Sequence, residues 1–213
     1  MLKVLALIKR LPTIDRKYFC DHYENTHVGV AKPVLRHLVR YARYHIEEEL
    51  HGDVDFDVIS YFGYSDKAAL DAMFAANASD AALPILEDER RFMDKPSNRF
   101  FEVSERVLKE GDEEGRSIFV LVARPQEMTR TECSRRLVRD DWPTLIGSIA
   151  GLRFAIVRDA FAMAERPVPF DGILQLAVGG EAEVRRFAAG MSEQGFRVVA
   201  VRTRRFVTAV PQA

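Results

Sequence analysis

Short runs of alternating apolar and polar residues recur in the same order in the two halves of the chain. Residues 3–10 (KVLALIKR) and 117–124 (SIFVLVAR) both read as strands, and so do residues 55–62 (DFDVISYF) and 169–176 (PFDGILQL). The members of each pair lie about 114 residues apart. Alternation with a period of two is typical of a half-buried strand, and a repeat this long is a domain rather than a solenoid unit. The pattern predicts two similar small domains, each with a sheet that needs a partner.

The first half is predicted to run in the order strand, helix, strand, strand, helix, strand. We expect the strands at residues 2–10, 38–46, 57–64 and 99–107. The helices are expected from Arg16 toward His27 with Asp15 as cap, over residues 67–76 with Asp66 as cap, and over a short stretch at 81–89. The acidic residues 47–55, which include Gly52, are expected to form a solvated turn.

The second half repeats this order. We expect strands at residues 117–124, 152–160, 172–178 and 198–210, and helices from Thr129 to about Trp142-Pro143 and over residues 181–193. The charged, glycine-containing segment KEGDEEG (109–115) is the predicted linker between a domain of residues 1–108 and one of residues 116–213. The fold class predicted is α+β, with two ferredoxin-like β-α-β-β-α-β repeats and antiparallel sheets.

Composition narrows the choice of partners. The 213 residues are 47% hydrophobic with a net charge of −1, which fits a packed core and gives no global field for nucleic acid or anionic lipid. No apolar run approaches the ~20 residues that span a bilayer, and the N-terminus reads as a strand rather than a signal peptide. Cys20 and Cys133 are expected to be reduced. We therefore expect a cytoplasmic protein that binds neither nucleic acid nor membrane.

Candidate chemistry concentrates in the stretch FCDHYENTH, residues 19–27. Phe19, Tyr23 and His27 are four residues apart and share one helix face, where they could form the base of a pocket for a flat substrate. His27 is the candidate general acid or base, and Tyr23 the candidate donor to a carbonyl or enolate oxygen. Alternatively, Phe19 is plain core and His27 caps the helix end. His22 lies off this face and is expected to be solvated.

The strand at residues 38–46 supplies a second set of candidates. Tyr41, Arg43 and His45 share one face, and Arg40 and Tyr44 the other. The sequence leaves open which face lines the site. If Tyr41, Arg43 and His45 line the site, they would orient a polar substrate. If they are buried in the core instead, they need hydrogen-bond partners within the protein.

A further segment, residues 87–94, has no counterpart in the second half. It is either a solvated helix end anchored by Phe92, or a lid in which Asp88 or Asp94 orients His27. The second half also lacks the imidazole and the phenol, because His27 aligns with Asp141-Trp142 and Tyr23 with Leu137 or Arg136. Chemistry is therefore expected in the first half. No CxxC pair, HExxH, GxGxxG, Walker or GxSxG motif is present, so no metal site is predicted.

Together the opening strand, the F-x-x-x-Y-x-x-x-H helix and the segment DERRFMDKPSNRFFEV resemble an EthD domain. The likeness covers about residues 2–107, although the family more often has Trp at or beside the position of Tyr23. It implies a dimeric α+β barrel, which the tandem halves would build within one chain, the second being a degenerate copy. Phe19, Tyr23 and His27 match the family's helix motif, and Asp88, Phe92 and Asp94 its late acidic-aromatic segment.

The resemblance implies a small enzyme without a cofactor, of lyase, isomerase or oxygenase type, that acts on a hydrophobic, aromatic or polyketide-like molecule in a first-half cleft. The alternatives are a non-catalytic module, small-ligand-binding or stress-associated, and a haem-binding protein with His27 or His45 as axial ligand. The tandem domains would pair with each other, so a monomer suffices, and homodimer formation stays open.

Overall fold

A computed structural model describes residues 1–111, 113, 115–163, 168–177 and 179–210, and it divides into two compact units. Unit 1 comprises residues 1–45, 55–102 and 206–213, and unit 2 comprises residues 46–54 and 103–205. Three strands, β2 (Arg40–His51), β4 (Arg99–Lys109) and β8 (Arg197–Thr208), contribute residues to both units. Within the described part of the chain, no helix is long and apolar enough to span a membrane.

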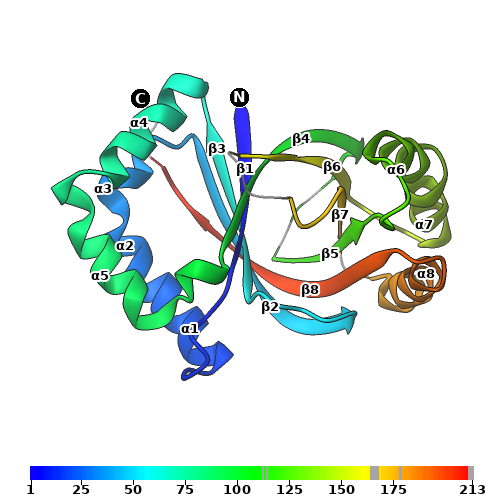
Figure 1. The fold of residues 1–213 in the computed structure, drawn as a ribbon. Coiled ribbons are helices and arrows are strands. Elements are labelled where there is room, and N and C mark those ends of the chain that lie inside the picture. Colours follow the sequence, from blue (N-terminus) through cyan, green and yellow to red (C-terminus); the bar gives the residue numbers. More distant parts are fainter. Residues whose placement is uncertain (112, 114, 164–167, 178, 211–213) are drawn as a thin grey trace. The chain divides into compact units, whose positions relative to one another are not determined.

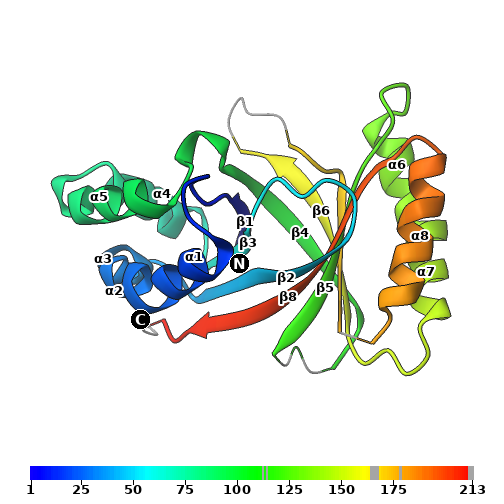
Figure 2. The same cartoon turned by 90° about the horizontal axis from the view of Figure 1, so that it is seen from below.

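The first half of the chain has the predicted element order, with extra helical turns (Figure 1). Its elements are β1 (Leu2–Ile8), α1 (Arg16–His22), η1 (Tyr23–His27), α2 (Val28–Val30), α3 (Lys32–Leu35), β2 (Arg40–His51), β3 (Val58–Tyr64), α4 (Lys67–Asn77), η2 (Asp80–Ala82), α5 (Leu83–Phe92), η3 (Lys95–Ser97) and β4 (Arg99–Lys109). In unit 1, β4 pairs with β1, β1 with β3 and β3 with β2, all antiparallel. The helices α1 to α5 lie on one side of these strands (Figures 1 and 2).

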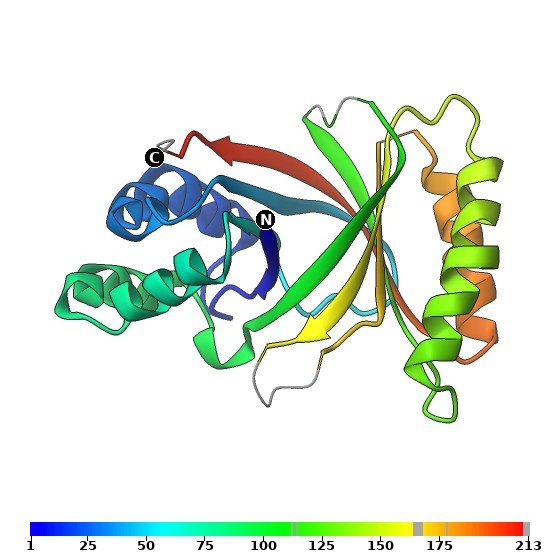
Figure 3. The ribbon, with the colours of Figure 1, turned by 90° about the horizontal axis from the view of Figure 1, so that it is seen from above.

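The second half is shorter and lacks a counterpart of α5. Its elements are β5 (Arg116–Ala123), α6 (Arg130–Arg136), η4 (Leu137–Asp141), α7 (Trp142–Ser148), β6 (Ala155–Ala162), β7 (Gly172–Ala177), α8 (Glu181–Glu193) and β8 (Arg197–Thr208). In unit 2, β8 pairs with β5, β5 with β7 and β7 with β6, all antiparallel. The helices α6, α7 and α8 cover one face of these strands (Figures 2 and 3).

Local signals explain where the main helices begin. Asp15 accepts a hydrogen bond from the backbone N–H of Tyr18, and Asp66 accepts one from that of Ala69, so both predicted caps are confirmed. Thr129 caps α6 through a reciprocal box with Glu132, which satisfies two backbone donors at once.

The core of unit 2 lies between its sheet and its three helices. Alternate residues of β5 and β7 point into it and meet Trp142, Leu145 and Val184 from the helices. Successive residues of β5 and β7 are nevertheless buried on both faces, and in β1 the five successive residues Val4–Ile8 are all buried as well. The sequence predicted one buried face for that strand, and both faces are buried.

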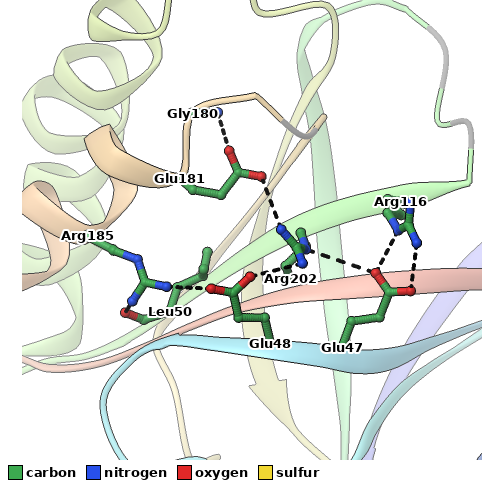
Figure 4. A network of polar contacts seen from close by, with 8 residues as sticks. All are labelled: Glu47, Glu48, Leu50, Arg116, Gly180, Glu181, Arg185 and Arg202. Carbon is green, nitrogen blue, oxygen red and sulfur yellow. Dashed lines mark hydrogen bonds and ion pairs between the residues drawn. The ribbon is translucent and has the colours of Figure 1, made fainter.

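The acidic turn predicted at residues 47–55 is wrong, because β2 continues as far as His51. Figure 4 shows the reason: arginines of unit 2 neutralise its acidic residues. Glu47 accepts from Arg116 at 2.6 and 3.1 Å, and Glu48 pairs with Arg185 at 2.7 Å and with Arg202 at 3.0 Å. These ion pairs let three consecutive glutamates continue as a strand.

Other boundaries shift modestly. The short helix expected at residues 81–89 is the turn η2 followed by α5, and the helix expected from Thr129 contains the π-helical turn η4. Asp112 and Glu114 of the expected linker, and Val178 at the end of an expected strand, lie outside the described residues.

Contacts within each unit recur at the same 114-residue spacing. Asp57 accepts hydrogen bonds from the backbone N–H and the Nε of Arg10, at 2.9 and 3.2 Å. Asp171 accepts from the backbone N–H of Arg124 at 2.9 Å and also from its guanidinium. In each unit, an aspartate just before one strand (β3 or β7) thus bonds an arginine just after another strand (β1 or β5).

Candidate functional site

The candidate site in unit 1 starts from an irregular helix. After α1 the chain makes one π-helical turn, Tyr23–His27, in which the N–H of Val28 donates to the carbonyl of Tyr23. A π-turn holds one residue more than an α-turn, and such turns are frequent at functional sites. Phe19, Tyr23 and His27 all point inward and are 0%, 2% and 5% exposed. The shared face predicted from their spacing is therefore observed.

His27 meets Asp88 of α5. The Nδ1 of His27 lies 2.9 Å from the Oδ2 of Asp88, and both side chains are 6% exposed. A carboxylate accepts hydrogen bonds, so Nδ1 carries the proton and Nε2 carries the lone pair. No described residue bonds Nε2, and this nitrogen is not among the buried polar atoms without a partner. The basic nitrogen of His27 therefore reaches the surface.

Electrostatics keep His27 neutral. Burial lowers its pKa below the usual 6.5, and the opposing effect of the hydrogen bond that His27 donates to Asp88 does not cancel this. A neutral imidazole at pH 7 with an unengaged Nε2 is poised as a base.

His22 also binds Asp88, so its predicted solvation is wrong. Its Nε2 lies 2.8 Å from Oδ1 of Asp88, and its side chain is 14% exposed. Its ring packs against Phe92 with centroids 4.6 Å apart and stacks on Tyr18 at 5.8 Å. The π-turn, which four-residue spacing cannot reveal, changes which residues share a face.

Phe92 is the apolar centre of the site. It is fully buried at the end of α5, and its ring centroid lies 5.1 Å from that of His27, 5.5 Å from that of Phe19 and 5.7 Å from that of Tyr23. Asp88 and Phe92 thus belong to the same buried cluster as the helix motif, rather than to a solvated helix end. Asp94 does not: it accepts from Ser97 at 2.6 Å.

Hydroxyl groups form a second layer behind the imidazole. The hydroxyl of Tyr23 lies 3.2 Å from that of Tyr41 and 3.2 Å from that of Ser60. Burial raises the pKa of Tyr23, against the opposing effect of these two hydrogen bonds, and raises the pKa of Tyr41 well above 10. Both phenols therefore stay protonated and can donate.

The strand face with Tyr41, Arg43 and His45 is the one that faces the site. Arg43 donates to both carboxylate oxygens of Glu24, from Nε at 3.0 Å and from Nη2 at 2.6 Å, and His45 donates to Glu24 from Nε2 at 2.7 Å. Arg43 also donates to Thr208 at 2.8 Å. Burial would raise the pKa of Glu24, but the hydrogen bonds from His45 and Arg43 outweigh it and lower that pKa.

Sequence reasoning missed Glu24 and Ser60. Glu24 was detectable in principle, because two basic residues on one buried strand face require a carboxylate nearby, and Glu24 lies inside the candidate helix. Ser60 gave no signal. Within the residues that the structure describes, no group of three or more His, Cys, Asp or Glu side chains could hold a metal ion.

Comparisons with known proteins confirm the EthD resemblance for part of the chain. Residues 11–96 match the family model described as the EthD domain. This stretch contains the π-turn and Asp88, and it ends just beyond α5. No curated protein matches the sequence of the chain.

Solved structures show the fold. An anthrone oxidase-like protein is 11% identical with a TM-score of 0.54, and the match covers 100% of this chain and 95% of that one. A mutant chlorite dismutase from Candidatus Nitrospira defluvii is 7% identical with a TM-score of 0.53, and the match covers 96% of this chain and 91% of that one. The chain thus has a mixed α+β fold with antiparallel strands, similar to the folds of these two proteins.

Proposed function

We propose that this chain is a small-molecule enzyme in which His27 removes a proton from carbon, without a metal or an organic cofactor. The observation that carries the proposal is the buried Asp88–His27 pair, in which the basic Nε2 of His27 has no hydrogen-bond partner among the residues that the structure describes. Asp88 fixes the ring and its tautomer, and stabilises the imidazolium that forms when Nε2 takes a proton. The lowered pKa of His27 keeps the base neutral before reaction.

Tyr23 is the proposed donor to the oxyanion that forms. Its hydroxyl remains protonated because burial raises its pKa, and Tyr41 and Ser60 offer it alternative partners. A substrate oxygen that replaced one of these partners would receive its hydrogen bond. Preorganised donors of this kind stabilise developing negative charge.

The substrate we propose is hydrophobic and aromatic or polyketide-like. The rings of Tyr23 and Phe92 contact the imidazole of His27, Phe19 packs against both of these rings, and one protein of the same fold is named anthrone oxidase-like. An anthrone is an aromatic ketone with an acidic C–H, which suits a single buried base. After deprotonation, the carbanion would either rearrange or expel a group, as in an isomerase or lyase, or react with dioxygen, as in an oxygenase.

We also propose that the chain is a tandem duplication of residues 1–108 and 116–213, joined by the linker at 109–115, which forms the barrel intramolecularly. The support is the recurrence of the π-turn and of the aspartate–arginine contact 114 residues apart. Leu137 and Asp141 stand at the places of Tyr23 and His27, so the second copy lacks the base. The cleft, the cytoplasmic location and the option of a homodimer stay predictions.

Anthrone itself is the probe for this function. The wild-type protein should accelerate deuterium exchange at its methylene carbon, followed by NMR, and aerobic samples should be checked for anthraquinone by absorbance. His27→Ala and His27→Gln should each lower the exchange rate on the order of 10²-fold or more. The control His51→Gln alters a histidine of unit 2 that bonds Ser192, and should leave the rate unchanged.

The rival reading is a binding module. It predicts that anthrone raises the melting temperature without exchange or turnover, and that His27→Gln changes nothing; that outcome would overturn the catalytic proposal. Haem finds less support. The Nε2 of His45, which is 3% exposed, is bonded to Glu24 and is not available to a haem iron.

A further inference from the structure

Two histidines share one buried carboxylate in unit 1. Oδ1 of Asp88 lies 2.8 Å from His22, and Oδ2 lies 2.9 Å from His27. The side chain of His22 is 14% exposed, whereas those of His27 and Asp88 are 6% exposed. The carboxylate therefore connects an outer imidazole to an inner one.

The π-turn makes this arrangement available. In a regular α-helix, residues five apart lie about 140° from each other around the axis, too far to share one partner. The extra residue of the π-turn closes that angle. Unit 2 provides an independent check, because Arg136 and Asp141 occupy the matching positions and lie side by side, with Nε 3.1 Å from Oδ2.

The protons can be placed from the geometry. Each oxygen of Asp88 accepts one hydrogen bond, so His22 donates from Nε2 and His27 from Nδ1. The lone pairs are left on Nδ1 of His22 and Nε2 of His27, and neither nitrogen is among the buried polar atoms without a partner. His22 thus holds Asp88 through its Nε2–H, and its Nδ1 makes no contact with the carboxylate.

We propose that His22 is a positioning residue for His27: it fixes Asp88 through Oδ1, and its hydrogen bond limits how strongly Oδ2 holds the Nδ1–H of the base. The inference rests on the proposed function only where it speaks of catalysis. The carboxylate of Asp88 divides its negative charge between two N–H donors, so His27 is less basic than it would be if it held Asp88 alone. His22 lowers the pKa of His27 in the same direction.

Asp88 is the charged side chain that contacts His22 directly. The helix α5 presents Asp88, and also Glu89, whose charge acts on His27 and which is paired with Lys95. The π-turn presents His27, and α1 presents Tyr18, which stacks on the ring of His22. The charges of Lys17 and Asp21 on α1 are exposed and paired with each other.

Histidine ¹⁵N NMR on the full chain tests this directly, with two variants. The wild type should show His27 as the Nδ1–H tautomer and His22 as the Nε2–H tautomer. His22→Phe retains a ring beside Phe92 but removes the donor, and should raise the titration midpoint of His27 by about one pH unit. His22→Gln retains an N–H donor for Asp88, and should preserve both the tautomer and the titration midpoint of His27.

An unchanged midpoint for His27 in His22→Phe, or the opposite tautomers in the wild-type protein, would overturn the inference. The wild-type spectrum alone reads the tautomers, so the test survives a variant that does not fold. NMR needs no substrate, which separates this test from that of the function. If the titrations behave as expected while His27→Gln leaves anthrone exchange intact, the function fails and the positioning role stands.

Discussion

Replacing Glu24 by Gln tests the buried charge cluster that holds the π-turn against β2. The Glu24 side chain is 10% exposed and accepts four hydrogen bonds, three from Arg43 and one from His45. In the variant, an amide NH₂ replaces one accepting oxygen and faces donors, and the charge of Arg43 stays buried without its partner. Breaking one side of a buried pair costs about 3–5 kcal/mol.

The melting temperature gives the readout. An unfolding entropy of about 2.1 cal/mol/K per residue is about 0.45 kcal/mol/K for a chain of this length, so a loss of about 4 kcal/mol lowers Tm by about 9 °C. The matched control is Glu47→Gln, which removes an equally bidentate partner from Arg116, whose side chain is 57% exposed. An exposed pair contributes about 0–1 kcal/mol, which corresponds to about 2 °C or less.

The dependence on pH gives a second test of the same cluster. The pKa of Glu24 lies below its usual 4.5 in the folded protein, so the carboxylate contributes its stability above that pH and loses it as the pH falls through the folded pKa. The gap in Tm between wild type and Glu24→Gln should be full at pH 7 and should narrow below pH 4.5. Equal Tm losses in the two variants, or a gap that does not change with pH, would refute the reasoning.

Three further predictions concern other parts of the molecule. Because the pKa of His27 is lowered, anthrone exchange should persist below pH 6.5 and fall only as His27 gains its proton; an acid limb centred above 6.5 in the pH–rate profile would contradict this. Gly52→Ala should lower the free energy of unfolding, measured in urea, by more than about 2 kcal/mol, because φ is +75° and a Cβ would lie 2.1 Å from a backbone carbonyl oxygen of β8. The control Gly115→Ala, where φ is +62° and no atom lies within 4 Å of the added Cβ, should lower it by about 1 kcal/mol. Asp57→Asn and Asp171→Asn should lower Tm by similar amounts if the two aspartates have the same role; a loss confined to one of them would count against the duplication.

Much of the fold could be predicted because its signals are local. The caps Asp15 and Asp66 lie at the starts of their helices, and α8 has the predicted bounds, because its periodicity and end signals agree. The end of β2 could not be predicted. Three consecutive glutamates oppose strand formation locally, and the arginines that reverse this lie at least 69 residues further along the chain.

In the candidate site, too, some residues could be predicted from the sequence and others could not. Four-residue spacing brought Phe19, Tyr23 and His27 together, and the inserted segment supplied Asp88 and Phe92, because both signals survive a small change in helical pitch. The role of His22 was hidden because a π-turn has no simple sequence signature, and one extra residue per turn moves a side chain to a different face.

The division of β2 and β8 between the units also bears on whether either half of the chain could form a complete unit alone. Leu50, late in β2, lies in the core of unit 2, while Thr208, at the end of β8, bonds Arg43 of unit 1. Each half of the chain therefore supplies residues to the unit that consists mostly of the other half. A chain cut at residues 109–115 would separate Thr208 from Arg43 and Leu50 from the rest of its core, so neither fragment would contain a complete unit.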